Sequence, residues 1–256
     1  MNNAALEFKN ISFQYGEHSN GTQVLKNMNL HIREGEFISI IGPSGSGKST
    51  LFKLITGLEQ PSEGEIFLRN RLAINRLGQV GYMPQQDLLL PWRTIMENAV
   101  LPLEIKGVKK HVALQKVSEL LEEFGLKGAE DCYPGELSGG MRQRVSFLRT
   151  ILSGSKILLL DEPFSALDAI TRLSLQEWLL TQWQKRKETI VFITHDVNEA
   201  LFLSDRILLF RETPATTLKE IIVPLERPRT LKDLNRPEVI SLKDELLEDL
   251  RTRTKT

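Results

Sequence analysis

The stretch 36-EFISIIGPSGSGKSTLFKLITGL-58 decides the fold. It begins with a short β-branched and aromatic run that ends at Gly42, and it closes with apolar residues at helical spacing, so it predicts a strand, a loop and a helix. The loop matches the pattern G-x-x-x-x-G-K-[ST] in the required context. Glycines let backbone N–H groups turn inward, and the positive end of the following helix favours an anion. The stretch therefore predicts a site for a nucleoside triphosphate.

We expect the loop and the first helical turn to contact the nucleotide. In this pattern the lysine bridges the β- and γ-phosphates, and the serine hydroxyl that follows it ligates Mg²⁺. The alternative is a glycine loop with an incidental lysine, which the flanking strand and helix argue against. The residues expected at this site are Gly42, Pro43, Ser44, Gly45, Ser46, Gly47, Lys48, Ser49 and Thr50.

A second apolar run, 156-KILLLDEP-163, predicts a strand buried on both faces that ends in two acids. Acids in this position are costly to desolvate unless they meet a cation or a reacting water. We expect Asp161 to orient Mg²⁺ and Glu162 to polarise the attacking water as a catalytic residue. The alternative is a pair of solvated acids in a loop.

Further strands are predicted at 189-TIVFITHD-196 and 206-RILLF-210, with helices between them. Strands that alternate with helices indicate an α/β fold with a mainly parallel sheet, in which ligands bind beyond the carboxyl ends of the strands. The middle of the chain predicts helices instead. Thr94 and Glu97 have capping-box spacing, one helix is closed by Gly125, and another begins after Leu137.

After residue 211 the pattern weakens, and the remaining segment is interpreted as packing material. Its last part predicts an amphipathic helix. The residues that share the apolar face of this helix are Val239, Leu242, Leu246 and Leu250.

The overall composition limits the partners of the chain. Among 256 residues, 33 Lys and Arg balance 33 Asp and Glu, so no general attraction to nucleic acid is indicated. The single cysteine, Cys132, excludes an intrachain disulfide and is expected to be a buried thiol, which suits a reducing cytosol. We expect no secretory leader, and the apolar runs are much shorter than the roughly 20 residues of a membrane helix. A membrane role would therefore come through a partner.

Taken together, the motifs GPSGSGKST, LSGGMRQR, LLLDEP, SALD and THD, with Gln85 between the first two, resemble the nucleotide-binding subunit of an ATP-binding cassette (ABC) transporter. The resemblance extends to about residue 210, and LSGG is its most specific element. It implies a P-loop NTPase (RecA-like) core with a mainly parallel sheet, an antiparallel β region near the N-terminus and an inserted α-helical subdomain. The corresponding division is a core of residues 1–86 and 154–212, a helical subdomain of 87–153 and a short tail of 213–256.

LSGG is a second glycine turn at a predicted helix N-terminus, and such a turn is itself an anion site. The resemblance implies that Ser138, Gly139 and Gly140 close over the γ-phosphate bound by a second copy, in an ATP-bound homodimer. Without the other motifs, LSGG also fits a capped helix start that binds nothing.

Other roles are implied by the resemblance residue by residue. Tyr15 would stack on adenine, although an aromatic residue near a strand end is more often part of the core. Gln85 would touch Mg²⁺ and report to the membrane partner, and its spacing from Pro91 favours it over Gln86. His195 would hold the γ-phosphate, although a lone histidine after a strand is more often structural.

The SALD motif, Ser165, Ala166, Leu167 and Asp168, corresponds to the D-loop, which crosses the dimer interface in the family. Asp168 is therefore included among the expected nucleotide-site residues. No motif is replaced by an inactivating residue, so both composite sites are expected to be competent if the chain pairs with itself.

The resemblance also implies partners and a location. It predicts two copies of a separate transmembrane permease subunit, an indirect link to a solute-binding protein, no nucleic acid, and a position at the cytoplasmic face of the cell membrane. The residues expected to grip the permease are Leu90, Pro91, Trp92 and Arg93, whose alternative is internal packing of the helical lobe.

Segments 88–107, 161–172 and 227–229 resemble the uptake branch for nitrate, sulfonate, taurine or a pyrimidine precursor. Two alternatives stay open. One is a soluble ABC ATPase without a transport role, and the other is a regulatory or purely structural nucleotide-binding module, which intact Glu162 and His195 argue against.

Overall fold

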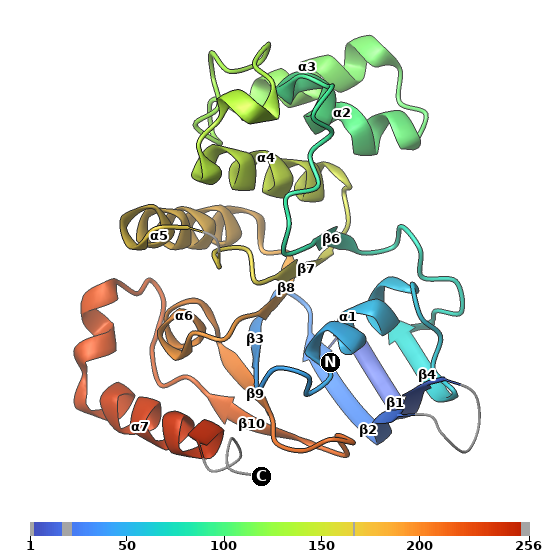
Figure 1. The fold of residues 1–256 in the computed structure, drawn as a ribbon, viewed down its shortest axis with the longest axis vertical. Helices are drawn as coiled ribbons and strands as arrows, with labels where there is room; N and C mark the ends of the chain where they lie inside the picture. Colours follow the sequence, from blue (N-terminus) through green and yellow to red (C-terminus); the bar gives the residue numbers. More distant parts are fainter. Residues whose placement is uncertain (1–2, 17–21, 166, 252–256) are drawn as a thin grey trace. The chain divides into compact units, whose positions relative to one another are not determined.

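In a computed structural model of the chain, residues 3–16, 22–165 and 167–251 are described. They form two compact units, coloured along the sequence in Figure 1. The first unit comprises Met1–Leu77 and Arg186–Thr256, and the second unit comprises Gly78–Lys185. The division into core, helical subdomain and tail expected from the sequence stays a prediction.

The first unit contains an antiparallel sheet near the N-terminus. Its strands are β1 (Ala4–Tyr15), β2 (Thr22–Arg33), β4 (Glu63–Leu68) and β5 (Arg71–Leu72), in the order β2-β1-β4-β5. Every pairing between neighbours is antiparallel. The antiparallel β region implied by the resemblance is therefore confirmed.

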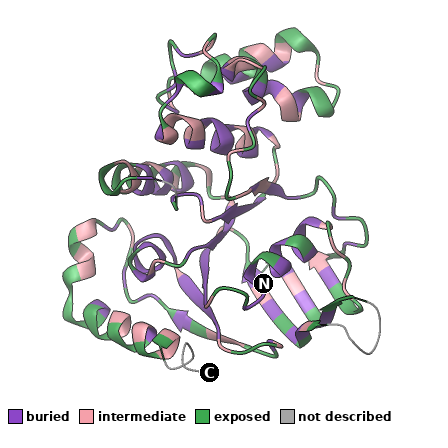
Figure 2. Ribbon diagram, viewed as in Figure 1, coloured by how far each residue is buried: buried purple, intermediate pink, exposed green. Residues whose placement is uncertain are grey.

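The same unit contains three strands buried along their whole length, β3 (Phe37–Ile41), β8 (Thr189–Ile193) and β9 (Arg206–Phe210), as Figure 2 shows. β3 pairs in parallel with both β8 and β9. Burial on both faces explains why these strands are continuous apolar runs in the sequence. The helices α1 (Lys48–Thr56) and α6 (Val197–Leu203) follow β3 and β8. Because parallel strands share an edge at their carboxyl ends, the loops after β3 and β8 start at one sheet edge.

The C-terminal segment adds more to this unit than the sequence predicts. β10 (Leu218–Ile222) pairs antiparallel with β9, and it is followed by a 3₁₀ turn, η3 (Leu231–Asn235), and by α7 (Pro237–Arg251). Val239 and Leu246 of α7 are buried against α6, β9 and β10. The predicted amphipathic helix is confirmed, whereas the strand β10 was missed.

The second unit contains a parallel pair of strands, β6 (Gly81–Met83) and β7 (Ile157–Asp161). Its helices are α2 (Ile95–Ile105), α3 (Lys110–Leu121), α4 (Gly139–Leu152) and α5 (Ala169–Arg186), with a 3₁₀ turn, η2 (Pro134–Glu136), before α4. Three aromatic rings pack together, from the turn after α3, from α4 and from α5. The ring centroid of Trp178 lies 5.0 Å from that of Phe124 and 5.4 Å from that of Phe147.

Two of the three predicted helix ends in the second unit agree with the structure, whereas the helix expected to be closed by Gly125 ends earlier, at Leu121. α2 begins with the Thr94 and Glu97 capping box, and α4 begins directly after Ser138. The expectation of a buried thiol at Cys132 is wrong, because this side chain is half-buried. Cys132 lies in the loop before η2, where its carbonyl accepts a hydrogen bond from Ile95 N at 2.9 Å, and such loops run over the protein surface.

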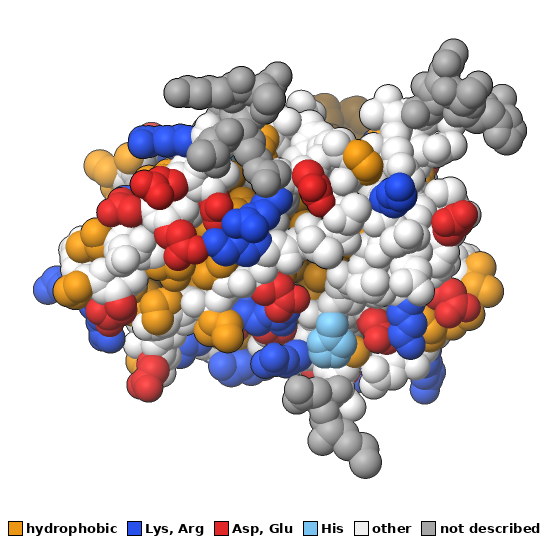
Figure 3. Space-filling view, turned by 90° about the horizontal axis from the view of Figure 1, so that it is seen from below, with side chains coloured by type: hydrophobic (Ala, Val, Ile, Leu, Met, Phe, Trp, Pro, Cys, Tyr) orange, Lys and Arg blue, Asp and Glu red, His pale blue; other side chains and the backbone are white. Residues whose placement is uncertain are grey.

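Two surface properties bear on the partners. Among the described residues, no helix combines the length and the apolar composition needed to cross a membrane. On the face shown in Figure 3, acidic and basic side chains lie interspersed.

Candidate nucleotide-binding site

In the first unit, the glycine loop between β3 and α1 has a shape that depends on its motif glycines. Gly47 has a φ of 104°, and a Cβ atom there would lie 2.7 Å from Cγ1 of Val24. A Cβ atom on Gly42 would lie 2.7 Å from Cβ of Phe210. Gly47 has no side chain to cap α1, so the N–H groups of the first helical turn are left for another acceptor. An anion is the acceptor that suits this position.

Lys48 is 8% exposed and is held at the mouth of this loop. Its Nζ donates hydrogen bonds to the carbonyl oxygens of Gly42 at 2.9 Å and of Pro43 at 2.8 Å. A cavity beside the loop is lined by Pro43, Ser44, Gly45 and Ser46, and by Arg211, Glu212 and Thr213 after β9. Ser49 and Ser44 are exposed. A buried ammonium next to exposed hydroxyls fits the binding of phosphate oxygens.

Tyr15, at the end of β1, lies beside α1 of the same unit. Its hydroxyl is 3.3 Å from Oγ1 of Thr50 and accepts a hydrogen bond from Nζ of Lys53 at 3.2 Å. The ring packs edge-on against Phe13, with centroids 4.9 Å apart, and the residue is 37% exposed. Tyr15 is therefore not a core residue, and its ring has surface left for a stacking partner.

His195 lies between β8 and α6, at the sheet edge from which the glycine loop also starts. The residues on either side of it are fixed by hydrogen bonds. Asp196 caps α6 by accepting from Asn198 N at 2.7 Å, and Asp196 N donates to Oγ1 of Thr194 at 3.0 Å. The imidazole itself is exposed, so the histidine is not buried structural packing.

In the second unit, the predicted acids at the end of β7 lie beside the predicted glutamine. β6 and β7 are parallel neighbours, and Nε2 of Gln85, which follows β6, donates to Oε2 of Glu162 at 3.1 Å. Asp161 is 9% exposed and accepts a hydrogen bond from the Tyr82 hydroxyl at 3.3 Å. Burial, reinforced by the charge of Asp161, raises the pKa of Tyr82 to about 12. Tyr82 was not predicted to take part in the site.

The backbone of Glu162 is in the left-handed region, with a φ of 45°. This conformation is costly for a residue with a side chain, and such strain is concentrated at functional sites. The turn that follows compensates for it, because the Glu162 carbonyl accepts hydrogen bonds from Ser165 N at 3.2 Å and Ser165 Oγ at 3.0 Å. The left-handed backbone, held by this turn, sets the direction in which the Glu162 side chain leaves the main chain.

We call residues 138–140 the signature turn. Ser138 caps α4 by accepting from Met141 N at 3.3 Å, and it is exposed. The reason for the second glycine lies in packing, because a Cβ atom on Gly140 would lie 2.8 Å from Cγ2 of Thr171 on α5. A Cβ atom on Gly139 would lie 3.3 Å from Leu167. The glycines let α4 begin close against the start of α5.

Asp168 has a local partner in the structure. It accepts hydrogen bonds from Ile170 N at 3.1 Å and Thr171 N at 3.0 Å at the start of α5. The hydrogen bonds from Thr171 lower the pKa of Asp168. Asp168 is exposed, and its neighbour Ala166 lies outside the described residues.

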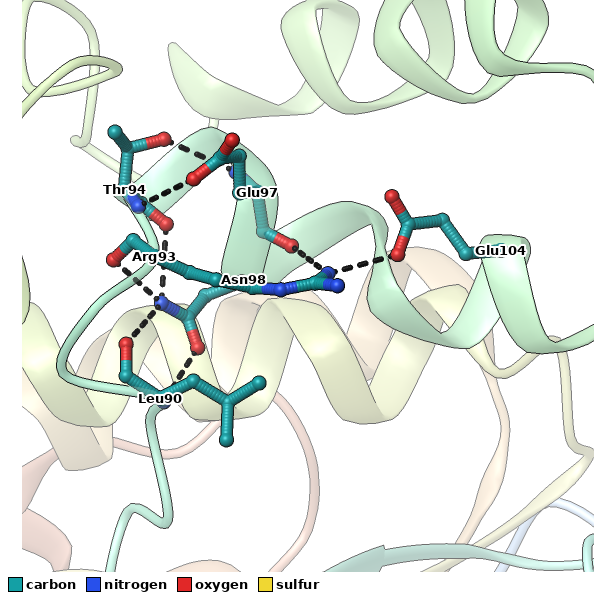
Figure 4. A network of polar contacts seen from close by, with 6 residues as sticks. All are labelled: Leu90, Arg93, Thr94, Glu97, Asn98 and Glu104. Carbon is teal, nitrogen blue, oxygen red and sulfur yellow. Dashed lines mark hydrogen bonds and ion pairs between the residues drawn. The ribbon is translucent and has the colours of Figure 1, made fainter.

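The segment expected to grip a permease is held rigidly by Asn98, which is fully buried (Figure 4). Asn98 accepts a hydrogen bond from Leu90 N at 2.8 Å and donates to the carbonyls of Leu90, Arg93 and Thr94 at 3.1, 3.0 and 3.0 Å. Arg93 pairs with Glu104 at 2.8 Å. Leu88 is 57% and Trp92 is 71% exposed, so these side chains do not pack inside the helical lobe.

Sequence reasoning also missed Asp87, Arg142 and Arg149, which lie next to the site residues in the second unit. Nε of Arg142 lies 3.2 Å from Oδ2 of Asp87. Arg149 donates to the carbonyls of Asp87 and Leu88. The one signal in the sequence was the spacing of seven residues between the two arginines, which places both on one helix face.

The expected cofactors are tested by the chemistry of the donor set. Ser49 of the first unit offers a hydroxyl. Asp161 and Gln85 of the second unit offer a carboxylate and an amide, and each of these groups is an oxygen donor of the kind that Mg²⁺ prefers. The glycine loop with its buried lysine fits a polyphosphate. The residues present therefore fit ATP with Mg²⁺.

A protein-family model described as ABC transporter matches residues 25–165. The chain belongs to the ABC transporter family. Among its relatives, this ABC chain is 45% identical to the formylaminopyrimidine import ATP-binding protein of Halalkalibacterium halodurans over 233 residues, which cover 91% of this chain and 90% of the relative. It is 43% identical to the aliphatic sulfonates import ATP-binding protein of Bacillus cereus over 220 residues, 86% of each chain.

Among solved structures, the ABC chain resembles a dimeric ATP-binding cassette in a post-hydrolysis state bound to ADP and Pi. The TM-score is 0.75 at 32% identity, and the match covers 86% of this chain and 100% of that one. The family and the P-loop NTPase fold expected from the sequence motifs are thereby confirmed.

Proposed function

We propose that this chain is the ATP-binding and ATP-hydrolysing subunit of an ABC importer. The observation that carries the proposal is the Glu162 carboxylate, which is held by Gln85 at 3.1 Å and aimed by a strained backbone next to Asp161. A chain that only bound nucleotide would have no need for this arrangement. The relatives that it resembles bear the names of import ATP-binding proteins.

The proposed roles follow from the chemistry of the side chains. Lys48 and the glycine loop bind the phosphates, and Tyr15 stacks on the adenine. Glu162 accepts a proton from the attacking water, and His195 holds the γ-phosphate. The remaining residues proposed to complete the site are Gly42, Pro43, Ser44, Gly45, Ser46, Gly47 and Thr50.

Ser49, Gln85 and Asp161 are proposed to hold Mg²⁺, which neutralises phosphate charge when it is bound. Ser138, Gly139, Gly140 and Asp168 are proposed to complete the nucleotide site of a second copy, so that the ATP-bound form is a homodimer. The exposed Ser138 cap at the start of α4 supports this role, because a helix N-terminus at the surface can receive another chain's phosphate.

The proposed membrane partner is a permease, present as two subunits, which places this chain at the cytoplasmic face of the cell membrane. We call residues 88–93 the docking strip, and its exposed Leu88 and Trp92 offer the apolar anchors of a protein interface. The strip belongs to the proposed helical subdomain, residues 87–153, between the two parts of the core, 1–86 and 154–212. The tail is 213–256.

The proposed solute is small, such as nitrate, a sulfonate, taurine or a pyrimidine precursor, delivered by a solute-binding protein. The class follows the names of the relatives, and the competing proposal is an ABC ATPase that serves no transporter. Affinity purification of the chain from membranes of its host, followed by peptide mass spectrometry, separates the two. We expect a multi-span protein to be captured by the wild type and lost with Trp92→Ala. An active ATPase that is recovered without any membrane protein would contradict the importer.

A further inference from the structure

In the second unit, two arginines of helix α4 contact Asp87 and Leu88, which follow Gln85 closely in the sequence. Nη1 of Arg149 donates to the carbonyl of Leu88 at 2.9 Å, and Nη2 donates to the carbonyl of Asp87 at 2.6 Å. Nε of Arg142, two turns earlier on α4, lies 3.2 Å from Oδ2 of Asp87. The main chain and the side chain of Asp87 are therefore both attached to α4.

Besides its contact with Asp87, Arg142 contacts the residue that precedes the signature turn. Its Nη1 donates to the carbonyl of Leu137 at 2.6 Å, and Leu137 directly precedes the signature turn. A guanidinium is planar and rigid, so its two contacts fix the positions of both partners at once. Arg142 thus connects the entrance of the signature turn to Asp87.

Residues 87–89 are also held by contacts among themselves. Oδ1 of Asp87 accepts a hydrogen bond from Leu89 N at 3.1 Å, and Leu88 is in the left-handed region with a φ of 46°. Arg149 stabilises this conformation through the carbonyls that it holds. Arg149 is partly buried, which lowers its pKa and would also make its donors costly to leave unpaired. Asp87, two residues after Gln85, therefore cannot move without a movement of α4.

We propose that Arg142 and Asp87 are positioning residues that align the signature turn with the Gln85 segment. The inference rests on the proposed function, because residues 138–140 act on the nucleotide of a second copy only in the ATP-bound pair. The ion pair adds no contact with nucleotide. It sets the geometry in which Ser138 approaches the phosphate, and it transmits displacement of the docking strip to the signature turn.

Asp87→Asn tests this role with little change of shape, because the Asn Oδ1 still accepts from Leu89 N. The variant removes an ion pair between partly exposed side chains, whose contribution is modest, so we expect kcat for phosphate release to fall by about two- to fivefold. ATP-driven pairing, measured by sedimentation in a Glu162→Gln background, should weaken by a similar factor. The affinity of the single chain for a fluorescent ATP analogue should stay unchanged.

Glu122→Gln is the matched control. Glu122 pairs with Lys127 at 3.1 Å in the same unit, and both side chains are mostly exposed, at 75% and 69%. This variant loses an ion pair of similar length that touches neither the signature turn nor the Gln85 segment. We expect its kcat and its pairing to equal those of the wild type. Melting temperatures of all variants are measured alongside.

A double-mutant cycle gives the sharpest test. If Asp87 and Arg142 act through one link, Asp87→Asn combined with Arg142→Gln should have the kcat of Arg142→Gln alone. A double variant whose loss is the product of the two single losses would overturn the proposal. The proposal would also fail if Asp87→Asn kept full kcat and pairing, or if its kcat loss came with an equal loss of analogue binding and a lowered melting temperature.

The proposed function fails in a different way. A wild-type chain that neither releases phosphate nor pairs with ATP would overturn that function, and this inference with it. An active wild type with an unaffected Asp87→Asn variant would overturn this inference alone.

Discussion

Replacing Asn98 by alanine should lower the free energy of unfolding of the second unit. The fully buried amide accepts a hydrogen bond from Leu90 N and donates to the carbonyls of Leu90, Arg93 and Thr94 (Figure 4). Alanine can replace none of these contacts. It leaves the Leu90 N–H without its acceptor and removes the side-chain donor of the Arg93 carbonyl, whereas the carbonyls of Leu90 and Thr94 keep backbone donors at 3.0 and 2.8 Å.

The magnitude follows from these contacts. The Asn98 amide has two N–H donors, shared among the three carbonyls, and one accepting oxygen, so about three net hydrogen bonds of about 1 kcal/mol each are lost, and the better helix propensity of alanine returns about 0.5 kcal/mol. We therefore expect the free energy of unfolding to fall by about 2 kcal/mol, since the carbonyls of Leu90 and Thr94 keep backbone partners. Because Asn98 holds the docking strip, capture of a membrane partner should be lost as well.

Urea unfolding followed by tryptophan fluorescence isolates the relevant unit. The chain has three tryptophans, Trp92, Trp178 and Trp183, and all of them belong to the second unit. Gln115→Ala is the control, since Gln115 is an exposed amide side chain on α3 of the same unit. A loss below about 1 kcal/mol for Asn98→Ala, or an equal loss for Gln115→Ala, would refute the reasoning.

Three further outcomes are expected. Lys48→Ala should weaken ATP binding by roughly ten- to a hundredfold in a titration, because hydrogen bonds from a charged group are worth about 1.5–3 kcal/mol, and unchanged binding would count against the glycine loop as the phosphate site. Gly140→Ala should destabilise the chain by about 1–3 kcal/mol. Adding Thr171→Ser removes the opposing methyl group and should recover much of this loss. A double variant that is no more stable than Gly140→Ala would disprove the steric cause. Asp249 accepts hydrogen bonds from Lys219 at 2.7 Å and from Arg211 at 2.9 Å, and these contacts hold its pKa below the ordinary value of 3.8. The wild type should therefore be more stable than Asp249→Asn, with the full difference above about pH 4. This difference should vanish as the pH falls through the lowered pKa. Parallel stability curves for both proteins down to pH 2 would contradict this assignment.

The sequence predicts the strands of the first unit well where burial is complete. β3, β8 and β9 are buried along their whole length, so each is a continuous apolar run that is easily identified as a strand. β10 was missed because its only buried residue is Ile221, and Lys219 and Glu220 interrupt the run. An edge strand with one buried position has almost no periodicity to detect.

The site was predictable as motifs and unpredictable as contacts. The local patterns place Lys48, Glu162 and Ser138 at the ends of strands and helices, where the structure has them. Arg142 and Arg149 contact residues 55 and 61 positions away, so no local pattern reveals their partners. Gly140 shows the converse, because its motif suggested phosphate binding, while a Cβ atom there meets Thr171 of another helix.

The central claim is that two copies of this chain close around ATP, each completing the other's site with its signature turn. The most direct test is the mass of the Glu162→Gln variant in analytical ultracentrifugation with saturating ATP and Mg²⁺. We predict the mass of two chains with ATP, that of one chain without it, and a return to one chain when Ser138→Arg is added. A Glu162→Gln variant that keeps the mass of a single chain at saturating ATP, or a pair that is indifferent to Ser138→Arg, would contradict the account.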